Sequence, residues 1–234
     1  MKSFTATAVL CLVALIVPAA ARESAAAAAK KPEVQTRESQ AAMTPSTALE
    51  RLKAGNARFV SNATKKRDWS AKVTATSAGQ FPFAAILACM DSRAPVEIVF
   101  DQGVGDVFGV RVAGNVVNDD EVGSLEYAVH VGTKLIIVLG HTSCGAVKGA
   151  IDDVQLGNLT GLLAKIHPAV EAASCRNSKE EACVTKVAEK NVLQSMQQIR
   201  EKSPYLATYL DEGKVRLIGA MYDVATGKVT FLEN

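Results

Sequence analysis

The sequence predicts an α/β fold, with a mostly parallel β-sheet core flanked by helices, an N-terminal helical arm and a closing C-terminal strand pair. Short continuous apolar runs, typical of buried parallel strands, occur at residues 83–88, 106–112 and 135–139. Helical patterns alternate with these runs, as crossovers between parallel strands require. Two further strand-like segments, 215–222 and 229–232, close the chain.

Residues 1–21 have the pattern of a secretory signal peptide. Met1 and Lys2 precede an apolar run over 6–17, and Pro-Ala-Ala-Ala follows at 18–21. The run is shorter than the about 20 residues that span a bilayer. We therefore expect an exported protein without a stable membrane span after signal removal, periplasmic in a Gram-negative bacterium and secreted otherwise. An N-terminal anchor or a buried helix is the alternative interpretation.

The segment that follows, residues 22–43, is Ala-rich and polar and shows no apolar periodicity, so we expect a flexible tether or a frayed helix. The globular domain then covers 44–234. Its first element is a helix, because Thr44 and Pro45 suit a helix start and apolar residues at helical spacing continue to about Ser61.

The central part of the domain alternates strands and helices. The run 83–88 follows Pro82, and the run 106–112 is the second strand. Residues 122–131 have helical spacing, and 135–139, Leu-Ile-Ile-Val-Leu, is the clearest buried strand of the chain. This alternation favours a parallel sheet with helical crossovers.

The last third of the chain is mainly helical until the two closing strands. Ser178 and Glu181 have the spacing of a capping box, which predicts a helix start. Thr226 and Gly227 form a hairpin-like turn between the final strands.

The composition excludes several classes of protein. With 48% hydrophobic residues and a net charge of +2, the chain is too apolar and too nearly neutral for intrinsic disorder. The small net charge also gives no electrostatic footprint for nucleic acid. We expect neither a nucleic-acid partner nor a second domain.

Reactive side chains follow two of the predicted strands. Cys89, Asp91 and Arg93 come directly after the first strand, and His141 and Cys144 follow the third. Parallel strands deliver functional residues at their carboxyl ends, and two Cys with one His is a ligand set that zinc uses when it keeps an open position. Spacing alone leaves other interpretations open: buried core cysteines, a structural histidine, a loop ion pair, or a disulfide between the two cysteines.

The pattern Cys89-x-Asp91-x-Arg93 followed by His141-x-x-Cys144-Gly resembles the zinc signature of β-class carbonic anhydrases. Other stretches are also similar to that family, and they extend the resemblance over roughly 44–234. These stretches are 49–59, 105–115, 124–129 and 219–223.

The resemblance implies one Zn²⁺ per subunit, held by Cys89, His141 and Cys144. It implies the reversible hydration of carbon dioxide to bicarbonate and a proton by attack of zinc-bound hydroxide, because zinc lowers the pKa of bound water from 15.7 to about 7. Asp91 would orient the zinc-bound water, and Arg93 would keep Asp91 ionised. In a closed state of the family, the same Asp becomes a fourth ligand.

The resemblance also implies substrate-binding roles for Gln80, Phe108 and Tyr127. The amide would bind bicarbonate, and the two rings would line an apolar pocket for carbon dioxide. The alternatives are a loop amide and two core aromatic residues. The family forms homodimers or homotetramers whose pockets take residues from two subunits, so we expect such an assembly. His130 and His167 fall in no family motif, and neither has an assigned role.

Three cysteines lie outside the proposed metal ligands. Cys11 would leave with the signal peptide, whereas Cys175 and Cys183 stay in the mature chain. Export favours a disulfide between these two residues, since disulfides persist in oxidising compartments.

Two other functions are consistent with the sequence. Relatives of the fold hydrolyse carbonyl sulfide or carbon disulfide with similar ligands. A structural zinc protein or a bicarbonate-binding module would need no turnover. Such a module predicts a missing Asp–Arg pair, and both Asp91 and Arg93 are present.

Overall fold

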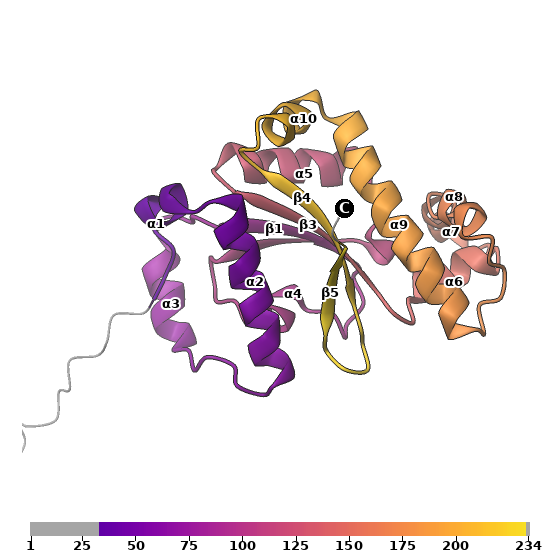
Figure 1. The fold of residues 1–234 in the computed structure, drawn as a ribbon, viewed down its shortest axis with the longest axis horizontal. Coiled ribbons are helices and arrows are strands. Elements are labelled where there is room, and N and C mark those ends of the chain that lie inside the picture. Colours follow the sequence, from indigo (N-terminus) through magenta and orange to yellow (C-terminus); the bar gives the residue numbers. More distant parts are fainter. Residues whose placement is uncertain (1–32, 233–234) are drawn as a thin grey trace, which may run out of the picture. The chain divides into compact units, whose positions relative to one another are not determined.

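The computed structural model describes residues 33–232 of the chain (Figure 1). The expected signal peptide at 1–21 and the expected tether as far as residue 32 lie outside the described residues. No helix within 33–232 combines the length and the apolar character that crossing a membrane requires.

Within the described residues, one five-stranded sheet has the order β2-β1-β3-β4-β5. Its strands are β1 (Ala84–Ala88), β2 (Val107–Arg111), β3 (Leu135–His141), β4 (Arg216–Tyr222) and β5 (Val229–Leu232). The first four strands pair in parallel, and β5 pairs antiparallel to β4. This is the mostly parallel sheet with a closing strand pair that the sequence predicts.

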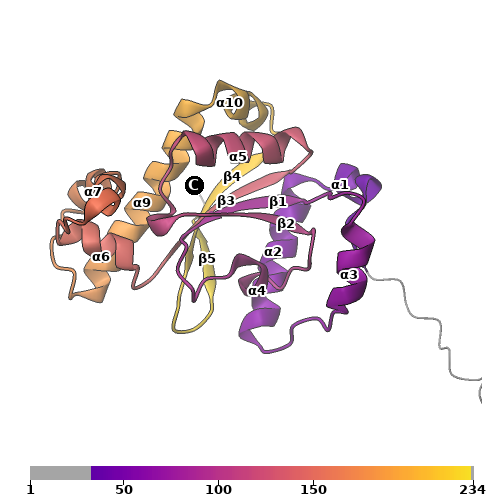
Figure 2. The same ribbon diagram turned by 180° about the vertical axis from the view of Figure 1, so that it is seen from behind.

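Helices cover both faces of the sheet (Figures 1 and 2). In chain order they are α1 (Arg37–Ala42), α2 (Pro45–Val60), α3 (Trp69–Thr76), α4 (Val96–Val99), the 3₁₀ turn η2 (Ala113–Asn115), α5 (Asp119–His130), α6 (Gly145–Ile151), α7 (Gly157–Leu163), α8 (His167–Ala173), α9 (Glu181–Lys202) and α10 (Pro204–Asp211).

Two hydrophobic cores lie on opposite faces of the sheet because side chains alternate along each strand. Ala85 and Leu87 of β1 belong to a core with α5, α6, α8 and α9, whereas Ala84 and Ile86 belong to a core with α2 and α4. Every residue of β1 and β3 is buried. Burial on both sides explains why these strands are continuous apolar runs in the sequence.

Two helices begin differently from the sequence-based expectation. α5 starts at Asp119, before the expected residue 122, because Asn118 caps it and Glu121 accepts from the Asn118 N–H. The expected capping box at Ser178 is wrong: its hydroxyl donates to Asp152, 2.8 Å away, and α9 begins at Glu181. Both differences arise from side-chain partners that spacing alone does not specify.

Within the segment expected as a tether or a frayed helix, residues 37–42 form the capped helix α1. Thr36 and Ser39 cap this helix reciprocally. Gln40 is buried, and its amide donates to the Pro82 carbonyl at 2.8 Å. The ordered arm therefore begins before Thr44, because a buried amide that satisfies a backbone carbonyl holds the segment against the domain.

A buried carboxylate joins α2 to the loop after α4. Asp101 is only 3% exposed and adopts a positive φ of 47°. Its oxygens accept from Arg58 Nε at 2.5 Å, from Arg67 Nη1 and from the Lys65 N–H. Burial alone would raise the pKa of Asp101, but the bonds from the two arginines outweigh burial and lower it.

We expect Asp101→Asn to reduce the free energy of unfolding by about 3 kcal/mol, because it leaves two partly buried guanidinium groups without their charge partner. Asn also tolerates positive φ, so backbone strain does not contribute. Asp211→Ala removes the exposed Arg200–Asp211 pair and should cost less than about 1 kcal/mol. Equal midpoints of urea unfolding for the two variants would contradict the larger contribution of Asp101.

The same carboxylate predicts a pH dependence. Because the folded pKa lies below the unfolded value of about 3.9, the contribution of Asp101 is complete above that pH and is lost as the pH falls through the folded pKa. Between pH 5 and pH 3, the wild-type chain should therefore lose more stability than Asp101→Asn.

Candidate metal centre

Three potential metal ligands meet at the carboxyl ends of β1 and β3. Cys89 directly follows β1, His141 is the last residue of β3, and Cys144 precedes α6. The two strands are parallel neighbours, with Ala88 opposite Leu139, so their ends open at the same edge of the sheet.

The three side chains form one buried cluster. Their candidate ligand atoms lie within 4.8 Å of one another, and the two Sγ atoms are 4.0 Å apart. Exposure is 5% for Cys89 and 1% for both His141 and Cys144. The structure therefore brings together the three residues that the sequence singles out as ligands.

Only one of the two ring nitrogens of His141 makes a hydrogen bond within the described residues. His141 Nδ1 lies 2.8 Å from the Thr142 carbonyl and donates to it. The buried Nε2 then carries a lone pair, and it has no hydrogen-bond partner within residues 33–232. A buried polar atom without a partner is costly, and a metal ion would satisfy it.

The two cysteines differ in acidity. The contact between the two sulfurs is the largest cause that lowers the pKa of Cys89, to about 4, while burial opposes this shift. His141 and the Gly114 N–H, 3.3 Å from the sulfur, lower it further. The bond to Cys89, together with burial, raises the pKa of Cys144.

This donor set fits Zn²⁺. A thiolate, a second sulfur that loses its proton to a divalent cation, and a neutral imidazole are ligands that zinc prefers. With three protein ligands, a tetrahedral ion keeps a fourth position for water or substrate.

An ion pair lies beside the cluster. Arg93 Nε and Nη2 donate to Asp91 Oδ1 and Oδ2 at 2.9 and 2.7 Å, and the Arg93 N–H also donates to Oδ1. These bonds hold the pKa of Asp91 well below its usual value. Asp91 Oδ2 is 3.9 Å from His141 Nε2, so the carboxylate borders the ligands.

Comparison with known proteins agrees with this geometry. The carbonic anhydrase family model matches residues 84–229. Carbonic anhydrase 2 of Mycobacterium tuberculosis is 34% identical over 197 residues, which cover 81% of this chain and 94% of the relative. A β-carbonic anhydrase of Aspergillus fumigatus superposes with a TM-score of 0.64 at 26% identity, covering 80% of this chain and 90% of that one. The chain belongs to the β-class carbonic anhydrase family.

Two further similarities support the assignment. Carbonic anhydrase from Mycolicibacterium smegmatis is 35% identical over 196 residues, covering 79% of this chain and 92% of the relative. A tetrameric β-carbonic anhydrase from Sordaria macrospora superposes with a TM-score of 0.63 at 25% identity, covering 69% and 85% of the two chains. Family membership identifies the chain as an enzyme of the carbonic anhydrase type, and its Cys-His-Cys cluster fits the zinc site of such enzymes.

Sequence reasoning missed two groups that hold the Cys89–Arg93 loop of this carbonic anhydrase. Arg111 donates to the carbonyls of Cys89 and Asp91 at 3.2 and 2.6 Å. The Tyr222 hydroxyl donates to the Arg93 carbonyl at 3.2 Å. Both residues end their strands, β2 and β4, at the edge that carries the ligands, and this position was the signal that could have identified them.

Gly114 packs directly against the cluster. Its φ is +67°, and a Cβ would lie 2.7 Å from Ile166 Cδ1. Its N–H donates to Cys89 Sγ, and its carbonyl accepts from Asn191 Nδ2 at 2.7 Å. A side chain at this position would therefore displace the donor to the sulfur.

The predicted pocket residues do not meet the metal cluster within one chain. The rings of Phe108 and Tyr127 pack edge to face, with their centroids 6.0 Å apart. They line a hollow of about 620 Å³ between β2 and α5. None of the three candidate ligands lines this hollow. Gln80 is exposed and precedes β1, whereas Cys89 follows it. A five-residue strand spans about 16 Å, so the amide lies at the opposite end of β1 from the ligands.

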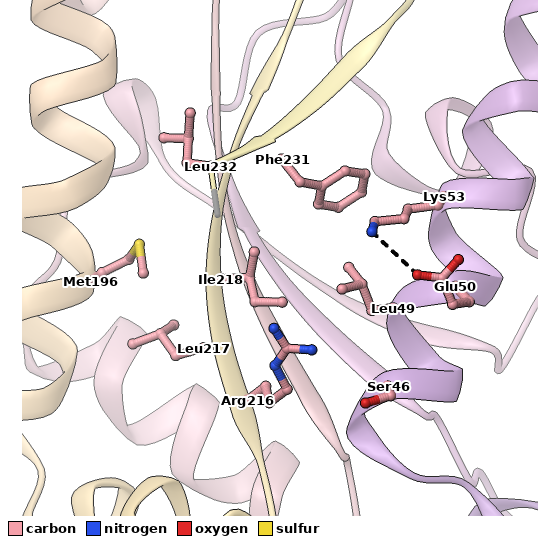
Figure 3. A pocket seen from close by; sticks show the side chains of 10 residues that line it. All are labelled: Ser46, Leu49, Glu50, Lys53, Met196, Arg216, Leu217, Ile218, Phe231 and Leu232. Carbon is pink, nitrogen blue, oxygen red and sulfur yellow. Dashed lines mark ion pairs between the residues drawn. The ribbon is translucent and has the colours of Figure 1, made fainter. Parts of the chain in front are cut away.

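A second hollow, of about 410 Å³, lies between α2, α9 and the β4–β5 pair (Figure 3). Leu49, Ile218 and Phe231 form part of its apolar wall, and Lys53 pairs with Glu50 at 3.2 Å on its rim. Arg216, another lining residue, is the first residue of β4. This hollow therefore reaches the end of the strand opposite to the metal cluster.

The other two cysteines within residues 33–232 are bonded to each other. Cys175 and Cys183 form a disulfide with a Cα–Cα distance of 5.5 Å, across the loop that precedes α9.

We expect the purified protein to contain one zinc ion per chain, and His141→Ala or Cys144→Ser to lower the zinc content well below this value. His167→Ala changes a partly exposed histidine outside the cluster and should keep full occupancy. Elemental analysis after dialysis measures this difference. Full occupancy in both ligand variants would contradict the assignment of the site.

Proposed function

We propose that this chain catalyses the reversible hydration of carbon dioxide to bicarbonate and a proton at a zinc ion held by Cys89, His141 and Cys144. The observation that carries the proposal is the buried three-ligand cluster bordered by the Asp91–Arg93 pair. When bound, zinc supplies Lewis acidity that ionises water near neutral pH. The protein residues position the reactants and the proton.

Asp91 would orient the attacking water. Its carboxylate is ionised beside Arg93, so it can only accept hydrogen bonds. Oδ1 already accepts from two nitrogen atoms of Arg93, whereas Oδ2 accepts from one and is the oxygen near His141 Nε2. A water that donates to Oδ2 then directs a lone pair away from Asp91, toward carbon dioxide.

The same pair governs whether the site is open. Asp91 could reach a metal only by giving up its bonds to Arg93, which hold both of its oxygens. In the structure these bonds are made, and this supports the open state as the resting arrangement. We propose that the closed state requires the Asp91–Arg93 pair to separate.

A second copy of the chain would complete the substrate pocket. Gln80 lies at the far end of β1 from the ligands, and Tyr127 is 53% exposed, so one chain does not assemble the predicted pocket. We propose a homodimer, or a homotetramer built from dimers, in which the amide and the aromatic rings of one subunit meet the metal centre of the other.

We propose that the mature enzyme is exported from the cytoplasm. The signal-like pattern of residues 1–21 and the Cys175–Cys183 disulfide both support an oxidising compartment outside the cytoplasm. In this proposal the periplasm is the site of action for a Gram-negative source.

We expect Asp91→Asn and Arg93→Ala to lower kcat/KM for carbon dioxide about 100-fold while zinc stays bound, because they remove the charged acceptor that orients the water, or the group that holds this acceptor in place, rather than a ligand. Stopped-flow hydration with a pH indicator measures the rate, with carbonyl sulfide and carbon disulfide assayed in parallel. Arg176→Ala breaks an exposed pair with Glu171 and should leave the rate unchanged. A zinc-replete wild-type protein without activity above pH 8 would overturn the proposed function.

Intersubunit completion predicts complementation between two inactive variants. Gln80→Leu keeps the metal ligands, and Cys144→Ser keeps the amide. A mixed dimer of the two, isolated with separate affinity tags, should contain one intact pocket and recover about half of the wild-type rate per dimer, since each pocket takes residues from both chains. A mixed dimer as inactive as the parents would exclude a shared pocket.

A further inference from the structure

The loop between β3 and α6 carries two of the three candidate ligands, His141 and Cys144, and its backbone is unusual. Ser143 adopts a φ of 52° in the left-handed region, which residues other than glycine rarely occupy. Such a conformation persists when surrounding contacts hold it. The contacts of Ser143 therefore bear on where the Cys144 sulfur lies.

The Ser143 residue is held through both of its backbone polar groups. Its N–H donates to Glu181 Oε1 at 2.6 Å, and its carbonyl accepts from Arg93 Nη2 at 3.3 Å. Arg93 is also the partner of Asp91. A continuous chain of hydrogen bonds thus runs from Glu181 through Ser143 to the Asp91–Arg93 pair.

Glu181 is itself fixed in place. Its second oxygen, Oε2, lies 3.6 Å from Lys148 Nζ on α6. It is the first residue of α9, two positions before the disulfide-bonded Cys183. The Asn177 N–H also points to Cys183 Sγ at 3.4 Å, so the covalent link and the backbone both tie the turn before α9.

We propose that Glu181 is a positioning residue of the metal centre, and that the Cys175–Cys183 disulfide keeps it on the Ser143 N–H. The proposal rests on the metal centre described above. A charged acceptor on a backbone donor makes a strong, directional bond. Without it, the loop would lose the contact that favours the strained Ser143 backbone, and the Cys144 ligand would become mobile.

The charge of Glu181 is consistent with this role. Burial alone would raise its pKa, but the bonds from Ser143 and the nearby Lys148 outweigh burial and lower it. The carboxylate is therefore ionised at neutral pH, although its side chain is 51% exposed. An exposed glutamate at a helix start would otherwise be explained by the helix dipole, which needs no contact with Ser143.

Glu181→Ala, compared with Glu180→Ala, tests the positioning role. Glu180 is the adjacent exposed acidic residue and lies just as close to the start of α9. We expect Glu181→Ala to speed the release of zinc to a chromogenic chelator about 10- to 100-fold, the range for residues that orient metal ligands. Glu181→Gln keeps the acceptor oxygen and should stay within about threefold of wild type, as should Glu180→Ala.

A spectroscopic measurement separates positioning from general destabilisation. In the cobalt-substituted protein, the visible absorption bands report the geometry around the metal. The positions of these bands should change in Glu181→Ala and stay the same in Glu180→Ala. A loss of thermal stability alone would not move them. Unchanged bands and a zinc release rate within twofold of wild type in Glu181→Ala would overturn the proposal.

The disulfide is tested by a double-mutant cycle. Replacing Cys175 and Cys183 with Ser should speed zinc release in the same direction as Glu181→Ala. Adding Glu181→Ala to that variant should then change the rate by less than about twofold, because the two changes break one connection. If the effects of the two changes on the zinc release rate multiply instead, the disulfide does not act through Glu181.

A wild-type protein that binds no zinc would instead overturn the metal site of the proposed function.

Discussion

The parallel pairing of β1 with β3 is the constraint on which the site depends. It places Ala88 opposite Leu139, so that Cys89 and the His141–Cys144 loop leave the sheet at one edge although the chain between them is long. A slip by one residue would turn the side chains of a strand to the opposite face. The ligand cluster would then separate, because Cys89 follows β1 whereas His141 and Cys144 come from the end of β3.

Backbone groups at this edge are held by side chains from distant elements. Arg111 holds the carbonyls of the Cys89 loop, Asn191 of α9 holds Gly114, and Glu181 holds Ser143. A metal centre needs ligands that are in place before the ion arrives, and loops alone are too mobile to provide this. The long helix α9 therefore supports the centre in addition to covering the sheet.

Much of the fold was predictable, because strands that are buried on both faces consist of continuous apolar residues. The predicted strand 135–139 falls inside β3, and the predicted strand 83–88 covers β1. The clustering of Cys89, His141 and Cys144 was also predicted, although spacing alone left core cysteines or a disulfide open, and it was the resemblance to β-class carbonic anhydrases that favoured a metal site. The start of α9 and the ordered arm at α1 were not predicted, since each depends on one distant side-chain contact. The contact of Glu181 with Ser143 was not predictable for the same reason: the sequence indicated Glu181 only as part of a capping box with Ser178, and its actual partner lies 38 residues away along the chain.

Only one of the two hydrophobic cores contains candidate metal ligands. Cys89 and Cys144 are members of the core beneath α5, α6, α8 and α9, and neither belongs to the core beneath α2 and α4. Because interiors are closely packed, a change of side-chain volume is felt by its neighbours. The molecule thus divides its tolerance to mutation: apart from Tyr222, whose hydroxyl holds the Arg93 carbonyl, residues of α2 and α4 in the second core can change without altering the packing around the two cysteines. Robustness is greatest on the face that takes no part in ligation.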